Sequence, residues 1–359
     1  MRLQARMLAR VHAEVLVVRG AIAESRHRVQ CAVLDATGAV LAASEHADGV
    51  TSFRSAAKPF QLLPFVERGH AEALHCSEPE LAIMAASHSG SREHLDLVRE
   101  FLRRIGRSAA DLACGYHEPM DAAELEEVRR DPRLASPIYN NCSGKHAGML
   151  AMAKAEGWPT AGYERLEHPL QQLVLRTVAD CCGVAAESIL LGVDGCSVPV
   201  FGMPLTAMAR GYARIAAAMA AGTPAEQGAP SNVARARALQ QIGRAMAAEP
   251  VIVEGKGRLA TDLMLAARGR IVAKSGAEGL LLVAEPATGR GIAIKCEDGA
   301  MRGLGPAAVE LLLTLGVLRD DEAAGLSLHR RPPVHDAAGH PVGWLEGRVH
   351  EAVPGDVRA

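Results

Sequence analysis

Hydrophobic and polar residues alternate along the first part of the chain in a pattern typical of strands. The pattern predicts strands at 14–18, 29–35 and 39–43, and the turn residues Ala36-Thr37-Gly38 join the last two as a hairpin. Similar short hydrophobic runs return late in the chain, where strands are expected at 270–274, 280–285 and 291–296.

Between these two groups of strands, hydrophobic residues recur with helical spacing. The pattern predicts helices at Lys58–Arg68, Glu78–Ala86, Arg92–Ile105, Lys145–Glu156, Pro169–Cys182, Leu205–Ala221 and Asn232–Ala248. Strands that bracket helices favour an α+β fold, in which N- and C-terminal strands share one largely antiparallel sheet covered by helices. The regular alternation of strands and helices that a doubly wound parallel sheet needs is absent.

The chain has 359 residues, of which 49% are hydrophobic, so it can bury a large core. Because no long linker rich in Ser, Gly or Pro interrupts it, we expect a single catalytic unit over residues 1–325. Residues 326–359 are expected to form a C-terminal hairpin and tail, with the hairpin turning at Ala338-Gly339.

The charge of the chain and its targeting signals argue against nucleic-acid binding, secretion and a membrane span. The formal net charge is -2 with both signs mixed along the chain, which argues against nucleic-acid binding. The start, Met1 to Arg6, is basic but is not followed by the apolar run of a signal peptide, and no apolar run is long enough to span a membrane. We therefore expect a cytoplasmic protein whose eight cysteines remain thiols.

Ser55-Ala56-Ala57-Lys58 places a hydroxyl and an amine one helical turn apart at the start of a predicted helix. Serine becomes a strong nucleophile only when a base removes its proton, and lysine can act as that base if its surroundings lower its pKa. By itself the motif is weak evidence, because many proteins contain it by chance as an ordinary helix-start serine and a solvated lysine.

Two further motifs follow in the order found in serine β-lactamases and penicillin-binding proteins. These are Ser87-His88-Ser89-Gly90, expected on a loop between helices, and Lys274-Ser275-Gly276, expected on a strand edge. Two features depart from that arrangement, because Ser55 and Ser87 are only about thirty residues apart and Ser89 replaces an expected asparagine.

Two loop-rich segments complete the pattern: Tyr139–Gly148, which reads YNNCSGKHAG, and Gly192–Pro199, which reads GVDGCSVP. Together with Phe53–Gln61, Ser87–Gly90 and Lys274–Gly279, they resemble the Rhizobium etli-type L-asparaginases, the asparaginase II family. The resemblance extends from about Glu14 to Leu315 and implies a fold like that of serine β-lactamases and glutaminases.

The resemblance implies two serine–lysine pairs in one site, Ser55 with Lys58 and Ser87 with Lys274. Ser55 is expected to be the nucleophile and Lys58 its general base, while Ser87 and Lys274 are expected to relay protons or assist activation. The resemblance also implies a zinc ion held by Cys142, Lys145 and Cys196. From the residues alone, both cysteines would be interpreted as structural loop cysteines.

The implied substrate is L-asparagine, whose ammonium needs an anion and whose carboxylate needs a cation or backbone amides. Asp194 and Arg54 are the candidates for these contacts, and His146 is a candidate hydrogen-bond donor near the zinc. Each residue also has a structural interpretation: Arg54 in an ion pair, Asp194 in organising its glycine turn, and His146 as a satisfied polar residue at a helix start.

The expected reaction is hydrolysis of L-asparagine to L-aspartate and ammonia through an acyl-enzyme, by a protein that the resemblance implies is a homodimer. One alternative keeps the same serines but acts on glutamine or a β-lactam. The other is a zinc-stabilised protein that binds an amino acid without turnover.

Overall fold

The computed structural model describes residues 9–221 and 230–352, and these fall into two compact units. The first unit combines the segments up to Ala56, Met203–Ala217 and from Asp262 onward; the second combines Ala57–Gly202 and Ala218–Thr261. The boundary expected at residue 325 falls inside the first unit. The basic start from Met1 to Arg6 lies outside the described residues.

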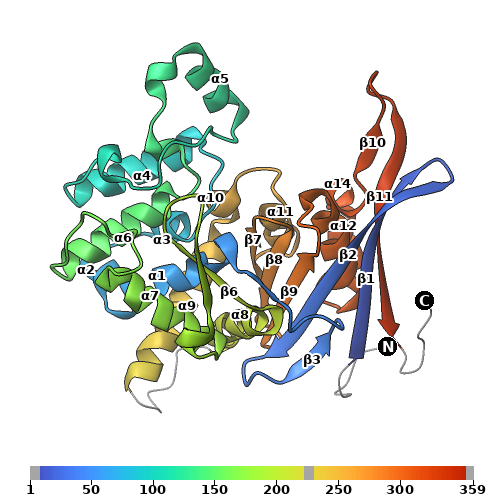
Figure 1. Cartoon of the computed structure of the whole chain (residues 1–359), viewed down its shortest axis with the longest axis horizontal. Helices are drawn as coiled ribbons and strands as arrows, with labels where there is room; N and C mark the ends of the chain where they lie inside the picture. Colours follow the sequence, from blue (N-terminus) through green and yellow to red (C-terminus); the bar gives the residue numbers. More distant parts are fainter. Residues whose placement is uncertain (1–8, 222–229, 353–359) are drawn as a thin grey trace. The chain divides into compact units, whose positions relative to one another are not determined.

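The first unit is built on an eight-stranded sheet in the order β10-β11-β1-β3-β2-β9-β8-β7. Its pairings are antiparallel except for a short parallel contact between β1 and β3, so the expected α+β class with a largely antiparallel sheet is confirmed. Figure 1 shows strands from both ends of the chain, blue and red, lying side by side in this sheet. The strands are β1 (Ala9–Arg19), β2 (Ile22–Asp35), β3 (Val40–Ala43), β7 (Val272–Gly276), β8 (Leu280–Glu285), β9 (Arg290–Cys296), β10 (Pro333–His335) and β11 (Pro341–Ala352).

The C-terminal hairpin is a full member of this sheet. β10 and β11 pair on either side of the turn at Ala338-Gly339, and β11 then runs antiparallel to β1 from Gly343 to Ala352. Gly343 has no side chain to obstruct this pairing, since a Cβ there would lie 2.1 Å from the carbonyl oxygen of Val18.

Helices pack on both faces of the sheet. A Cβ at Gly291 of β9 would lie 1.9 Å from the carbonyl oxygen of Ala209, so α8 (Leu205–Ala220) contacts the sheet there. Cys296, five residues further along β9, lies against α12 (Met301–Thr314). Neighbouring side chains of a strand point to opposite faces, so α8 and α12 cover opposite faces. All residues of β8 are buried, as expected for a strand covered on both sides.

The register of the sheet places Lys274 on the face covered by α8. Lys274 pairs with Leu282, which pairs with Ala293, and Ala293 shares its face with Gly291 two residues earlier. β7 is the edge strand of the sheet, which agrees with the strand-edge position expected for the Lys274-Ser275-Gly276 motif.

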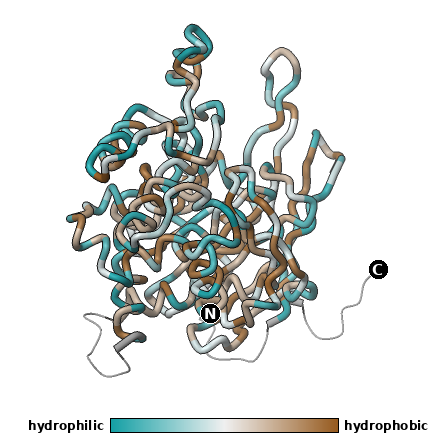
Figure 2. Tube along the Cα trace, turned by 60° about the vertical axis from the view of Figure 1, so that its left-hand side comes forward, coloured by the Kyte–Doolittle hydropathy of each residue, from teal (hydrophilic) through white to brown (hydrophobic). Residues whose placement is uncertain are grey.

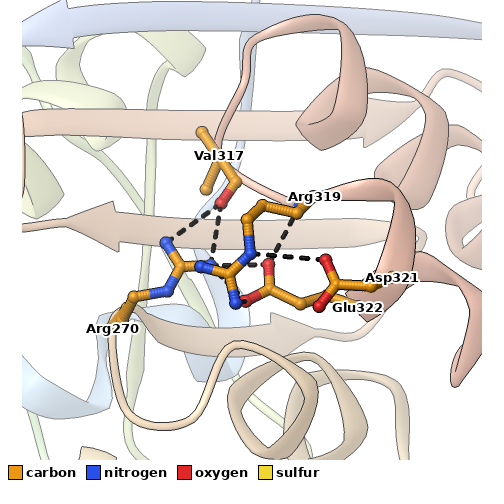
Figure 3. A network of polar contacts seen from close by, with 5 residues as sticks. All are labelled: Arg270, Val317, Arg319, Asp321 and Glu322. Atoms are coloured by element: carbon orange, nitrogen blue, oxygen red, sulfur yellow. Dashed lines mark hydrogen bonds and ion pairs between the residues drawn. The ribbon is translucent and has the colours of Figure 1, made fainter.

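A polar network holds the segment that leads into β7 (Figure 3). Arg270 donates to both carboxylate oxygens of Glu322 at 2.6 Å and to the carbonyl oxygen of Val317 at 3.4 Å. The backbone N–H of Arg319 donates to the same buried carboxylate at 2.9 Å, at the start of α13 (Asp320–Ala324). The network ties the chain before Lys274 to the segment after α12, and the short α14 (Ser327–Arg330) follows.

The second unit is mainly helical. It contains α1 (Lys58–Glu67), α2 (His70–Ala73), α3 (Glu78–Met84), α4 (Arg92–Arg104), α5 (Ala122–Arg130), α6 (Ser143–Ala155), α7 (Pro169–Cys182), α9 (Pro230–Ala248) and α10 (Pro250–Glu254), while α11 (Leu259–Ala266) crosses its boundary. β5 (Leu190–Val193) pairs with β6 (Pro199–Pro204), whose last residues belong to the first unit. β4 (Val50–Ser52) also belongs to the first unit, and η1 (Arg54–Ala57) crosses the boundary just before α1. Figure 2 shows hydrophobic stretches within the fold and largely hydrophilic chain at protruding loops.

The predicted helices are present with ends within about two residues of expectation. α7 begins and ends where its pattern does, with Pro169 in its first turn and Gly183 closing it in the left-handed conformation at φ 68°. Within residues 9–221 and 230–352, no helix has the length and hydrophobicity needed to cross a bilayer.

Candidate active site

Lys58 is the first residue of α1 and is almost completely buried, with an exposed fraction of 1%. Its Nζ lies 2.5 Å from the carbonyl oxygen of Ala86, 2.8 Å from Oγ of Ser87 and 3.4 Å from the carbonyl oxygen of Asn141. These three acceptors match the three N–H donors of an ammonium group. Asn141 was not singled out in the sequence, although its backbone carbonyl accepts from Lys58 and its side-chain Oδ1 accepts from the thiol of Cys142 at 3.3 Å.

Ser87 follows α3 in a segment that is neither helix nor strand, and its side chain is partly exposed. Its backbone N–H donates to the carbonyl oxygen of Val253 at 2.9 Å, which fixes the segment against α10. The family resemblance implies a pairing of Ser87 with Lys274. The second unit shows a direct contact of Ser87 with Lys58. Lys58 therefore contacts Ser87 in space, and along the chain it follows Ser55 by three residues.

His88 does not serve Ser87 as a base. Its Nδ1 accepts the backbone N–H of Gly90 at 3.1 Å, which leaves the proton on Nε2, 2.9 Å from Oγ of Ser143. Burial, followed by the neighbouring His94 and Lys58, lowers the pKa of His88 well below its ordinary value, so the ring is neutral. His88 therefore supports the structure of the serine segment through Gly90 and Ser143.

Ser55 lies in η1 and is partly exposed. The hydroxyl of Tyr212 on α8 donates to the carbonyl oxygen of the next residue, Ala56, at 2.9 Å. Arg54 has a left-handed backbone at φ 43°, a strained conformation for a side-chain-bearing residue, and its Cβ lies 3.4 Å from where a Cβ of Gly276 would be.

Gly276 and Lys274 lie two residues apart on the same face of β7, a separation of about 7 Å. The first unit therefore brings the Arg54-Ser55 backbone close to the strand that carries Lys274. Lys274 is fully buried, and its Nζ donates to the carbonyl oxygen of Ser275 at 2.9 Å. Arg54 also forms a 3.9 Å ion pair with the exposed Glu278, which fits its structural interpretation.

The Tyr139–Gly148 motif contains the start of α6, and two of its glycines pack against α3. A Cβ at Gly144 would lie 2.3 Å from the carbonyl oxygen of Ile83, and one at Gly148 would lie 3.1 Å from Sδ of Met84. The two glycines are four residues apart and lie on one face of α6, which lets α6 approach α3 closely. Cys142 precedes the first turn of α6, and Lys145 and His146 lie within it.

Cys142, Lys145 and Cys196 form a buried cluster. Nζ of Lys145 lies 2.9 Å from Sγ of Cys196, and the thiols of Cys142 and Cys196 are within hydrogen-bonding reach of each other. Contact with Cys196, assisted by the amines of Lys58 and Lys145, lowers the pKa of Cys142 well below its ordinary value despite burial. The same contact, together with burial, raises the pKa of Cys196. Burial alone would lower the pKa of Lys145, but the two cysteines outweigh it and raise that pKa.

His146 has one satisfied and one unsatisfied nitrogen. The hydroxyl of Tyr163 accepts the N–H of Ala113 at 2.9 Å and donates to Nδ1 of His146 at 2.7 Å, so the proton of the neutral ring lies on Nε2. Burial, then the charges of Lys145 and Lys58, lowers the pKa of His146. Among the described residues Nε2 has no hydrogen-bond partner in good geometry, although the backbone of Cys196 is near.

Asp194 organises the turn that carries Cys196. Its Oδ1 accepts the N–H of Gly195 at 2.8 Å, its carbonyl oxygen accepts the N–H of Ser197 at 2.9 Å, and its own N–H donates to Val198 at 2.9 Å. The turn interpretation of Asp194 is therefore correct, and the side chain remains partly exposed. Its carboxylate is also close enough to contribute to the raised pKa of Lys145.

The sequence profile of the L-asparaginase II family matches residues 15–347. The chain belongs to the L-asparaginase II family. No curated protein sequence matches it. A solved structure titled "Crystal structure of Mglu in its native form in the presence of 4.3M NaCl" aligns with 19% identity and a TM-score of 0.33. That alignment covers 84% of this chain, and the chain spans 60% of the length of that protein.

For this L-asparaginase II family member, the expected zinc ligands form a chemically suitable set. Two thiols, one of them with a lowered pKa, are donors that zinc prefers, and the lysine amine next to them completes three donors. No three His, Cys, Asp or Glu side chains gather at one point in the described part of the chain, so a site here depends on the lysine. The residues therefore fit zinc only with Lys145 as a ligand.

Proposed function

We propose that this protein is an L-asparaginase that hydrolyses L-asparagine to L-aspartate and ammonia through an acyl-enzyme on Ser55. The observation that supports this most strongly is the buried amine of Lys58, which contacts Ser87 and lies three residues after Ser55. A buried lysine that contacts one serine and follows another by three residues along the chain, in a member of the L-asparaginase II family, suits proton transfer to and from a serine nucleophile.

In the first stage, Oγ of Ser55 attacks the side-chain amide carbon of asparagine and its proton passes to Lys58. The C–N bond then breaks, and ammonia leaves with a proton from the lysine. In the second stage, water attacks the β-aspartyl ester, Lys58 takes a proton from that water, and the proton returns to Ser55. Lys58 must begin as a free amine, so the ammonium must first release a proton, and Ser87 at 2.8 Å offers a relay for it.

Lys274 has a supporting role in this proposal. It is buried on β7, on the same face as Gly276, beside which the backbone of Arg54 passes. We propose that its charge assists activation of the serines, as the family resemblance implies. The developing oxyanion needs preorganised donors, and the backbone N–H of Ser55 is one candidate.

Substrate recognition is assigned to Arg54, Asp194 and His146. The guanidinium of Arg54 suits the α-carboxylate of asparagine, and the partly exposed carboxylate of Asp194 suits its ammonium. The unsatisfied Nε2–H of His146 supplies a buried donor, which gains a partner when substrate binds.

Zinc bound by Cys142, Lys145 and Cys196 would act as a Lewis acid or order the substrate pocket. The raised pKa of Lys145 describes the metal-free cluster, and zinc binding would release protons from the amine and a thiol.

We also propose that the protein is a homodimer. Sedimentation or mass photometry can measure its mass in solution.

The test is to incubate the purified protein with L-asparagine, L-glutamine and a chromogenic β-lactam and to measure ammonia release and ring opening. Ammonia from asparagine that disappears in Ser55→Ala but persists in Ser188→Ala, an exposed serine outside the site, supports the proposal. Activity confined to glutamine or the β-lactam would favour the alternative acyl-serine enzyme. Ligand-induced stabilisation without any turnover would favour an amino-acid-binding protein.

A further inference from the structure

A hollow lies in the helical unit, next to the segment that carries Ser87. Its volume is about 490 Å³, and it is bordered by residues from the starts of α4 and α5 and from the segment around α10. This volume lies within the range of roughly 300 to 1,000 Å³ typical of small-molecule sites. Lys58, Ser87, Cys142, Lys145 and Cys196 are not among its lining residues, so the hollow is separate from the cluster described above.

The lining carries equal numbers of cationic and anionic side chains: Arg92, Lys256 and Arg258 against Glu93, Asp121 and Glu124. Arg92 and the buried Glu124 already form an ion pair at 3.2 Å. Lys256 and Arg258 are exposed and form no ion pair within residues 9–221 and 230–352. A polyanion would meet the opposing carboxylates, whereas a zwitterion can match charges of both signs.

Internal hydrogen bonds hold one wall of the hollow. The buried His94 accepts the N–H of Ser91 at 3.2 Å and contacts its hydroxyl at 2.6 Å through Nδ1. Its Nε2 then donates to the carbonyl oxygen of Val251 at 3.1 Å, which connects the start of α4 to α10. The wall is therefore preorganised and does not need a ligand to form.

The same wall is linked to Ser87. The carbonyl oxygen of Ser89 accepts the N–H groups of Met120 and Asp121, both at 2.8 Å, while Val253 of α10 accepts the N–H of Ser87. At Gly255, with φ +113°, a Cβ would lie 2.6 Å from Oγ of Ser89, so α10 and the serine segment are in close contact. The lining of the hollow and Ser87 therefore share two supports, α10 and the segment that includes Ser89.

We propose that this hollow is an effector site for a free α-amino acid. The ligand's carboxylate binds Lys256 and Arg258, its ammonium lies against Glu93 and Asp121, and its occupancy is transmitted to Ser87 through α10. Binding of the amino acid in the hollow does not depend on the proposed asparaginase activity. The effect of binding on catalysis through Ser87 rests on that proposed function.

Hydrogen–deuterium exchange of the full-length protein with L-aspartate as the probe tests the binding directly. We expect slower exchange in peptides covering residues 89–94 and 251–258. In the double variant Lys256→Ala with Arg258→Ala, the L-aspartate concentration for half-maximal protection rises at least about tenfold, because two charge-assisted contacts are lost. The matched control, Arg99→Ala with Arg103→Ala, removes two exposed arginines of α4 and leaves that concentration unchanged.

Succinate, which lacks the ammonium, distinguishes a zwitterion site from a general anion site. The proposal predicts little protection by succinate at concentrations where L-aspartate protects these peptides. Equal protection by succinate, no protection by L-aspartate, or protection that is unchanged in the double variant would each overturn it. Exchange needs no turnover, so these results are independent of whether asparagine is hydrolysed, and binding at the proposed catalytic site is recognised by protection around residues 54–58.

Discussion

Nζ of Lys58 lies 2.8 Å from Oγ of Ser87, although 29 residues separate them along the chain. The contact gives the buried amine a neighbouring hydroxyl through which a proton can leave. It also joins Lys58 to the second serine motif within the second unit, whereas Ser55 belongs to the first unit. The proposed chemistry of Ser55 depends on this amine cycling between its charged and neutral forms.

Replacing Lys58 by Met keeps the length of the side chain but removes the amine. Because general base catalysis contributes about 10²- to 10⁴-fold, we expect kcat for asparagine to fall about 10³-fold or more. Lys154→Met is the matched control, since Lys154 also donates to a backbone carbonyl, that of Ile105, but lies elsewhere. A Lys58→Met enzyme with kcat close to the wild-type value would exclude Lys58 as the base.

Gly144→Ala tests the close packing that places the cysteine–lysine cluster. The added Cβ would lie 2.3 Å from the carbonyl oxygen of Ile83, so α6 must shift. We expect a loss of about 2–3 kcal/mol in the free energy of unfolding, together with weaker zinc binding. Gly325→Ala is the control, because its nearest contact is 3.5 Å away and its φ is -70°, and its stability should be unchanged or slightly higher. Equal stability of the two variants would contradict the packing argument.

Glu156, which directly follows the last residue of α6, leads to a prediction about how stability depends on pH. The hydrogen bond from Arg68, at 2.6 Å, and that from His70 lower the pKa of Glu156 against the opposing effect of burial. A carboxylate with a lowered pKa stabilises the folded state above its unfolded pKa of about 4.3, and this contribution is lost as the pH falls through its folded value.

Glu156→Gln should therefore reduce the free energy of unfolding by about 1 kcal/mol at pH 7. The difference from the wild type should shrink as the pH falls below about 4.3. Urea denaturation of both proteins between pH 7 and pH 3.5 measures it, with Glu100→Gln as an exposed control on α4. A difference that stays constant across this range would show that the charge of Glu156 is not responsible.

Hydrophobic patterning predicted the strands and helices that frame the site, and it did so best where local signals are strong. α7 has a proline in its first turn and a glycine after its last residue, and both of its ends were predicted. The pattern missed the first half of β2, where Ile22–Arg26 is exposed and no buried face imposes alternation. It also did not reveal that β11 pairs with β1, because strand pairing over such a separation depends on tertiary contacts.

The candidate site was predictable to the extent that motifs identify its residues. Spacing and resemblance singled out Lys58, Ser87 and the cysteines, but they did not predict the contact between Lys58 and Ser87. Tyr163, which sets the tautomer of His146, lies outside every motif and gives no sequence signal. Contacts to backbone carbonyls, such as that of Lys58 to Asn141, are likewise not encoded by side-chain type.

Removing one proposed zinc ligand gives a readout that does not need turnover. We expect the wild-type protein to bind about one zinc ion per chain and Cys196→Ser to retain less than about a tenth of it, with a lowered Tm. Cys76→Ser, which changes a partly exposed cysteine elsewhere, should retain the wild-type zinc content. Elemental analysis after dialysis measures both, and full zinc retention in Cys196→Ser would show that the metal, if bound, lies elsewhere.

The most direct test of the account is to identify the residue that is acylated during turnover. The protein is mixed with L-asparagine, quenched in acid within one turnover, digested and analysed by mass spectrometry. The account predicts a β-aspartyl ester on the peptide containing Ser55 and its absence in Ser55→Ala. An ester on Ser87, or turnover of asparagine in Ser55→Ala, would contradict it.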